Sequence, residues 1–122
     1  MATILVIDDD VQINKLLNKM LVRDGHQVHT AKDGVEGMKT FNQFKPDLVI
    51  TDIIMPKKDG FEVIKELLEH DLKLPIIAMT GALYDMTTGC NIDSFELLGV
   101  AGTIQKPFAL QQMRDMVQVA LT

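Results

Sequence analysis

The chain has 122 residues, of which 47% are hydrophobic and 24% charged, and its 12 basic and 17 acidic side chains give a net charge of −5. This length and composition suit one globular domain, so we expect residues 1–122 to form a single domain. Because the sequence has no cluster of Lys and Arg, we expect no direct contact with nucleic acid. No apolar run approaches the roughly 18 residues that span a bilayer, and the N-terminus lacks the basic start of a signal peptide. The one Cys cannot form an internal disulfide. We therefore expect a cytoplasmic protein that does not enter a membrane.

Short apolar runs, typical of strands buried on both faces, alternate along the chain with amphipathic segments at helical spacing. Asp10 stands where an N-cap would begin the first helix, and Gly25 where that helix would end. The sequence predicts five strands, at Ile4–Ile7, Gln27–Ala31 (the weakest), Leu48–Thr51, Ile76–Met79 and Gly102–Gln105. The helices between and after them are expected over about Val11–Arg23 (marked by Leu16, Leu17, Met20 and Leu21), up to about Phe44 (Val35, Met38 and Phe41), after a turn at Met55–Gly60 (Phe61, Ile64, Leu67 and Leu68), near Asp93–Leu98, and at the end of the chain (Leu110, Met113, Val117 and Leu121).

This order is strand then helix, repeated five times. Such alternation predicts an α/β fold, a doubly wound five-stranded parallel sheet with helices on both faces and right-handed crossovers. In open sheets of this class, ligands bind at the carboxyl ends of the strands. Candidate functional residues should therefore follow the ends of the predicted strands.

Four of the predicted strands end in a polar residue: Asp8 with Asp9 after the first, then Asp52, Thr80 and Lys106. A single Asp after a strand most often caps a helix or forms a turn, but chance rarely places all of these at successive strand ends. Clustered carboxylates repel one another unless a cation lies between them, and oxygen ligands suit Mg²⁺. A lysine can pair with a phosphate oxygen, and a carboxylate can itself attack phosphorus to form an aspartyl-phosphate.

These residues stand in a pattern that resembles the receiver domain of two-component response regulators. The resemblance extends from Thr3 to about Ala120, and the Asp-x-x-Met-Pro-x-x-Asp-Gly stretch makes it highly specific. It implies the flavodoxin-like (βα)5 fold with strand order 2-1-3-4-5. The stretches that carry it are Ile4–Asp10, Asp47–Phe61, Pro75–Gly81 and Lys106–Phe108.

The resemblance implies a Mg²⁺ site at the strand ends. Asp9 and Asp52 would bind the ion directly, Asp8 would hold a water molecule of its shell, and the backbone carbonyl of Ile54 would complete the protein ligands.

The resemblance also implies a phosphoryl-transfer role. Asp52 would be the phosphoacceptor, attacking the phosphohistidine of a partner kinase, Thr80 would hydrogen-bond a phosphoryl oxygen, and Lys106 would pair first with Asp52 and then with the phosphoryl group. The implied partners are a sensor histidine kinase or phosphotransfer protein and a downstream protein target, and a phosphorylation-dependent dimer is a further option. The expected role is that of a signalling switch rather than an enzyme.

Three features depart from the usual receiver pattern. The spacing from Thr80 to Lys106 is a few residues longer than usual, with the extra residues expected within Leu83–Ile92. Thr103 stands where many receivers carry Tyr or Phe and cannot make the aromatic side-chain rotation associated with that position. Gly81 stands where Ala is common. The route from the phosphorylation site to an output surface is therefore left open by the sequence.

Three other functions also remain open at this point. A degenerate receiver would act as an interaction module without phosphorylation, but this chain keeps all the implied site residues. A Mg²⁺-dependent hydrolase with an aspartyl-phosphate intermediate would need a second carboxylate as general acid, which Asp52-Ile53-Ile54 lacks. A flavin-binding module would need a Ser/Thr/Gly-rich loop after the first strand, where this chain has carboxylates.

Overall fold

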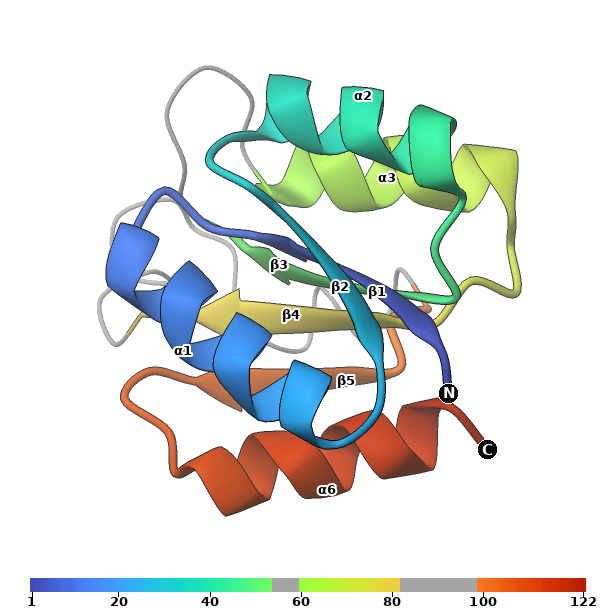
Figure 1. Cartoon of the computed structure of the whole chain (residues 1–122). Coiled ribbons are helices and arrows are strands. Elements are labelled where there is room, and N and C mark those ends of the chain that lie inside the picture. The colour runs from blue at the N-terminus through green and yellow to red at the C-terminus, as the bar shows by residue number, and fades with distance from the viewer. Residues whose placement is uncertain (54–59, 82–98) are drawn as a thin grey trace.

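The computed structural model describes residues 1–53, 60–81 and 99–122, except for the side chain of residue 61 (Figure 1). Within these residues there are five strands, which form one sheet, and four helices. Their bounds are β1 Thr3–Ile7, α1 Val11–Arg23, β2 Gln27–Ala31, α2 Gly34–Phe44, β3 Leu48–Asp52, α3 Gly60–His70, β4 Ile76–Thr80, β5 Gly102–Gln105 and α6 Leu110–Ala120.

The five strands form one parallel sheet in the order β2-β1-β3-β4-β5. This confirms the expected doubly wound α/β fold and its strand order. Ile7 pairs with both Ala31 and Thr51, and Asp52 pairs with Met79. The register therefore aligns the carboxyl ends of the central strands at the same edge of the sheet.

The sheet lies between two layers of helices, with α2 and α3 on one face and α1 and α6 on the other (Figure 1). Successive strand residues point to opposite faces, so β1 supplies Leu5 and Ile7 to the core under α2 and α3, and Ile4 and Val6 to the core under α1 and α6. All four of these side chains are fully buried. This burial on both faces explains the continuous apolar runs of the sequence.

Local sequence signals set the bounds of the first helix. Asp10 adopts an extended conformation and its side chain accepts a hydrogen bond from the N–H of Gln12, at 2.9 Å, which confirms it as the N-cap of α1. After the helix, Gly25 has a φ of +94°, a left-handed conformation that suits glycine. The helix thus begins and ends where the sequence predicts.

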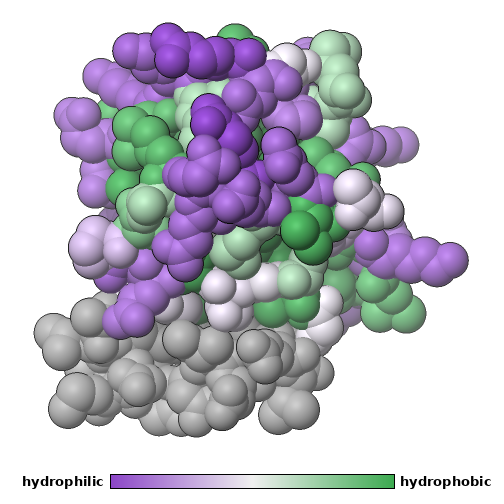
Figure 2. Space-filling view, turned by 90° about the horizontal axis from the view of Figure 1, so that it is seen from below, coloured by the Kyte–Doolittle hydropathy of each residue, from purple (hydrophilic) through white to green (hydrophobic). Residues whose placement is uncertain are grey.

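Some residues expected on buried helix stripes are exposed. Val35 is 57% exposed and Leu16 is 42% exposed, so both lie outside the buried faces of the helices that they were used to predict. In α2 the buried face is instead formed by Gly34, Gly37, Met38 and Phe41, because Gly37 brings the helix against the side chain of Ile7. Figure 2 shows the face of the molecule seen from below, where apolar residues appear among hydrophilic ones.

Three predictions about the course of the chain lie outside the described residues: the turn Met55–Gly60, apart from Gly60 itself, the extra residues within Leu83–Ile92, and the helix near Asp93–Leu98. Among the residues that the structure describes, no helix has the length and apolar character needed to cross a bilayer.

Candidate functional site

The polar residues predicted at the strand ends meet at the carboxyl edge of the sheet. One carboxylate oxygen from each of Asp8, Asp9 and Asp52 lies within 4.8 Å of the other two. The ammonium nitrogen of Lys106 lies 2.7 Å from Asp8 Oδ2 and 3.3 Å from Asp52 Oδ2. Residues that are up to 98 positions apart in the chain are therefore in direct contact.

Asp8 is fully buried at the end of β1, and its polar atoms are bonded on all sides. Its N–H donates to the carbonyl of Ala31 at 3.0 Å, its Oδ1 accepts from the N–H of Asp10 at 2.8 Å, and its Oδ2 accepts from Lys106. Burial raises the pKa of the Asp8 carboxyl above its ordinary value, and the bonds from Lys106 and Asp10 oppose that rise. The position of this carboxylate is thus closely fixed.

Asp52 is the last residue of β3 and is 6% exposed. Its Oδ1 accepts a hydrogen bond from the N–H of Ile53 at 2.8 Å, and its Oδ2 faces Lys106. Burial, followed by the neighbouring negative charge of Asp8, raises the pKa of the Asp52 carboxyl to about 6, although Lys106 favours the ionised form. The carboxylate is therefore held ionised at neutral pH at a cost in folding free energy.

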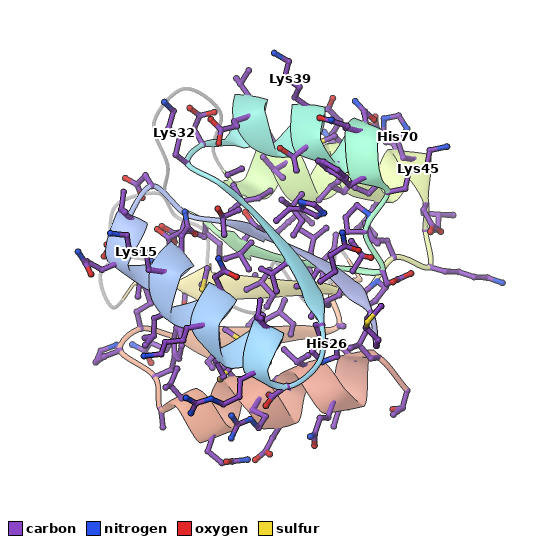
Figure 3. The ribbon with its side chains drawn as sticks, in the orientation of Figure 1. Lys15, His26, Lys32, Lys39, Lys45 and His70 are labelled. Atoms are coloured by element: carbon purple, nitrogen blue, oxygen red, sulfur yellow. The ribbon has the colours of Figure 1, made fainter. Side chains whose placement is uncertain are left out.

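Lys106 follows β5, and its backbone N–H donates to the carbonyl of Thr80 at 2.7 Å. The peptide bond between Lys106 and Pro107 is cis. Burial would lower the pKa of the Lys106 ammonium, but the hydrogen bond to Asp8 and the charge of Asp52 outweigh it and raise that pKa. By contrast the side chains of Lys32, Lys39 and Lys45 are exposed (Figure 3).

Of the other residues singled out by the sequence, Thr80 lies at the site and Ile54 is not described. Thr80 ends β4 at the same edge, is 3% exposed, and its hydroxyl donates to the carbonyl of Ile104 at a long 3.4 Å. Ile54 lies outside the described residues. Thr103, at the position usually aromatic in receivers, is a half-buried residue of β5 that pairs with Ala78.

The acidic cluster suits a divalent cation of the Mg²⁺ type. It offers carboxylate oxygens, which are the ligands that Mg²⁺ prefers, and three carboxylates against one ammonium leave a net charge of −2 at the site when all are ionised. Asp8 and Asp52 are buried whereas Asp9 is exposed, so the cluster opens to solvent on the Asp9 side. The chemistry and burial of these donors therefore fit the ion that the sequence implies.

Two residues of the site were missed by sequence reasoning. Asn14 of α1 donates hydrogen bonds to the carbonyls of Asp8 and Ala31; its spacing of three and seven residues from Leu17 and Leu21 places it on the buried stripe and could have marked it. Gly60, predicted only as a turn residue, donates its N–H to the carbonyl of Ile53 at 2.7 Å. A Cβ at Gly60 would overlap the carbonyl oxygen of Asp52, so the start of α3 approaches the end of β3 closely.

Comparisons with known proteins agree with this geometry. The family model described as "Response regulator receiver domain" matches residues 4–118. The chain is 36% identical to the alkaline phosphatase synthesis transcriptional regulatory protein PhoP of Bacillus subtilis, over 97% of this chain and 48% of that protein. It is 37% identical to the probable transcriptional regulator ycf27 of Guillardia theta, over 97% of this chain and 44% of that protein.

Solved structures give the same result. A response regulator receiver domain protein from Clostridium thermocellum superposes with a TM-score of 0.86 at 30% identity, covering 99% of this chain and 94% of that one. The receiver domain of NtrX from Brucella abortus superposes with a TM-score of 0.86 at 29% identity, covering 97% of each chain. The chain thus spans about half the length of the curated relatives and nearly all of these solved receiver structures.

Proposed function

Because the chain belongs to the response regulator receiver domain family of two-component systems, we propose that it accepts a phosphoryl group on Asp52 and acts as a phosphorylation-controlled signalling switch. We also propose that residues 1–122 form one receiver domain. The observation that carries the proposal is the buried Asp52 carboxylate, which lies 3.3 Å from Lys106 Nζ in the same cluster as Asp8 and Asp9.

The proposed phosphoryl donor is a phosphohistidine on a sensor histidine kinase or a phosphotransfer protein. An oxygen of the Asp52 carboxylate attacks the phosphorus atom, and the bond from phosphorus to the donor imidazole nitrogen breaks. The imidazole leaves with the bonding electron pair, and the product on this chain is an acyl phosphate at Asp52. Transfer of this kind depends on positioning and on neutralising charge more than on covalent help from the protein.

In this proposal Lys106 supplies a fixed positive charge at the reacting group. Its ammonium already lies beside Asp52, and its raised pKa keeps it protonated at neutral pH. Once Asp52 carries a phosphoryl group, the ammonium would pair with a phosphoryl oxygen. The buried hydroxyl of Thr80, whose bond to Ile104 is long, would donate to another phosphoryl oxygen, and this exchange of partners would shift the end of β4. A downstream protein would recognise the altered surface.

The proposed cofactor is Mg²⁺. Asp9, Asp52 and the backbone carbonyl of Ile54 would hold the ion directly, and Asp8 would hold it through a water molecule. When bound, the ion supplies positive charge that stabilises the phosphoryl oxygens during transfer. The Asp8 carboxylate would keep its bond to Lys106, and so would orient the ammonium toward Asp52.

Phosphorylation with a small donor tests the proposal. The protein is incubated with phosphoramidate and Mg²⁺ and its intact mass is measured, with Asp52→Asn as the test variant and Glu69→Gln, an exposed carboxylate on α3, as the matched control. We expect a gain of one phosphoryl group in the wild type and in the control, no gain in Asp52→Asn, and no gain when EDTA removes the metal. A wild type that gains no phosphoryl group would refute the proposal and would favour a degenerate receiver that acts by interaction alone.

A hydrolase would behave differently in the same mixture. It would release inorganic phosphate from a phosphate ester such as p-nitrophenyl phosphate over many turnovers, whereas the proposed switch accumulates one phosphoryl group per chain. Sustained release of phosphate that depends on Asp52 would therefore favour the enzyme, and a yellow protein with bound flavin would favour the flavin module.

A further inference from the structure

Asn14 is a polar residue on the buried face of α1 and is only 8% exposed. Its amide nitrogen donates one hydrogen bond to the backbone carbonyl of Asp8, at 2.9 Å, and another to that of Ala31, at 3.2 Å. Both partners are acceptors, so the NH₂ group must face them. The Ala31 carbonyl also accepts the N–H of Asp8. Asn14 thus joins α1, the end of β1 and the end of β2 at the edge that carries the acidic cluster.

The other side of this amide has no such bonds. Among the described residues, Asn14 Oδ1 is buried and has no hydrogen-bond partner. A buried acceptor without a partner destabilises the folded state, so the stabilising interactions of this amide are the two bonds that its nitrogen donates. Both bonds end on the backbone at the acidic cluster.

The hydrogen bond from Asn14 to the Asp8 carbonyl fixes the orientation of the peptide group between Asp8 and Asp9. This carbonyl belongs to the peptide that links Asp8 to Asp9, and its orientation sets the backbone torsion that leads to Asp9. The Asp8 side chain is held by Asp10 and Lys106. Asp9 is exposed, and in the described part of the chain no hydrogen bond or ion pair holds its carboxylate. The Asp9 carboxylate therefore depends on the backbone for its place beside Asp8 and Asp52.

We propose that Asn14 is a positioning residue for the acidic cluster: by bonding the carbonyl of Asp8 it fixes the direction of the Asp9 carboxylate and thereby raises the affinity of the site for a divalent cation. The inference rests on the proposed function, because it concerns the metal site of that proposal. Residues that hold metal ligands in place typically change metal affinity by about 10–100-fold when they are substituted.

Calorimetric titration of the whole chain with Mg²⁺ tests this role. Asn14→Leu keeps a similar volume and removes both donated bonds, and Asn18→Leu, one helical turn further along α1 at an exposed position, is the matched control. We expect Mg²⁺ to bind Asn14→Leu about 10-fold more weakly or worse, and to bind Asn18→Leu as it binds the wild type. The free energy of unfolding in urea without metal should change little in Asn14→Leu. Removing the unpaired acceptor Oδ1 stabilises the folded state, and this offsets the cost of leaving the carbonyl of Asp8 without a partner.

Equal Mg²⁺ affinity in Asn14→Leu and the wild type would overturn the inference. If Asn14→Leu does not fold, NMR of the wild type decides instead: the side-chain NH₂ signals of Asn14 should shift during a Mg²⁺ titration and those of Asn18 should not, and an unmoved Asn14 signal would overturn the inference. A wild type whose Mg²⁺ affinity depends on Asn14 but which gains no phosphoryl group would refute the proposed function and leave this inference standing, whereas a wild type that binds no Mg²⁺ would overturn both.

Discussion

Removing the charge of Asp52 by the substitution Asp52→Asn should make the metal-free protein more stable at neutral and alkaline pH. The carboxyl is 6% exposed, and its pKa is raised from 3.8 to about 6 by burial and by the charge of Asp8. Because the folded state binds this proton more tightly than the unfolded chain, ionising Asp52 destabilises the fold. The penalty is fully present above the folded pKa and disappears as the pH falls toward the unfolded value.

The size of the effect follows from the shift in pKa. One pKa unit corresponds to about 1.4 kcal/mol, so the penalty from Asp52 is about 3 kcal/mol at pH 8 and about half of that at pH 5. Asp52→Asn removes the charge and keeps an oxygen that can accept the N–H of Ile53. We therefore expect the variant to be more stable than the wild type by about 1–3 kcal/mol at pH 8, and by less at pH 5.

Urea unfolding in EDTA, followed by circular dichroism at pH 8 and at pH 5, measures this difference. Glu69→Gln removes an exposed carboxylate of α3 and is the control; it should change stability by no more than about 0.5 kcal/mol at either pH. An Asp52→Asn protein that is no more stable than the wild type at pH 8, or one whose advantage grows as the pH falls, would refute the electrostatic reasoning.

Three further predictions concern the same edge of the sheet. Mg²⁺ at ten times its Kd should stabilise the wild type by about 1.4 kcal/mol in urea unfolding and should not stabilise Asp9→Asn to the same extent; no effect on the wild type would count against a metal site. Lys106→Met leaves Asp8 buried without its ammonium partner, so we expect a loss of about 1–3 kcal/mol at pH 8 and a smaller loss at pH 5, and a loss that does not depend on pH would contradict this. Gly60→Ala places a Cβ against the carbonyl of Asp52, so it should cost about 1–3 kcal/mol in the same assay, whereas Gly81→Ala, which meets no atom within 4 Å, should not.

The helices and strands could be predicted from the sequence largely because their end signals are local. Asp10 caps α1 through a bond to Gln12, two residues away, and Gly25 adopts the left-handed conformation after it. Burial was less predictable, because the apolar character of Val35 does not reveal that Gly37 is the residue that packs against Ile7. Strand order came from the family resemblance, since hydrophobic periodicity does not specify which strands are neighbours.

The candidate site could be predicted only in part. Asp8, Asp9 and Lys106 follow strands and Asp52 ends one, and the parallel sheet brings such residues to one edge. The partners of Lys106 were not predictable in detail: its nitrogen lies closer to Asp8, at 2.7 Å, than to Asp52, at 3.3 Å. Asn14 escaped notice because a polar residue within a helix usually faces solvent, and only the packing of α1 against the strand ends reveals its two bonds.

Chemical mapping can identify the residue that receives the phosphoryl group, which we propose to be Asp52. The protein is treated with phosphoramidate and Mg²⁺ and then reduced with borohydride, which converts an aspartyl-phosphate to homoserine, and the digested peptides are sequenced by mass spectrometry. We predict homoserine at position 52 and unmodified aspartate at positions 8 and 9. Homoserine at another position, or unmodified aspartate at all three positions, would show that Asp52 is not the phosphoacceptor.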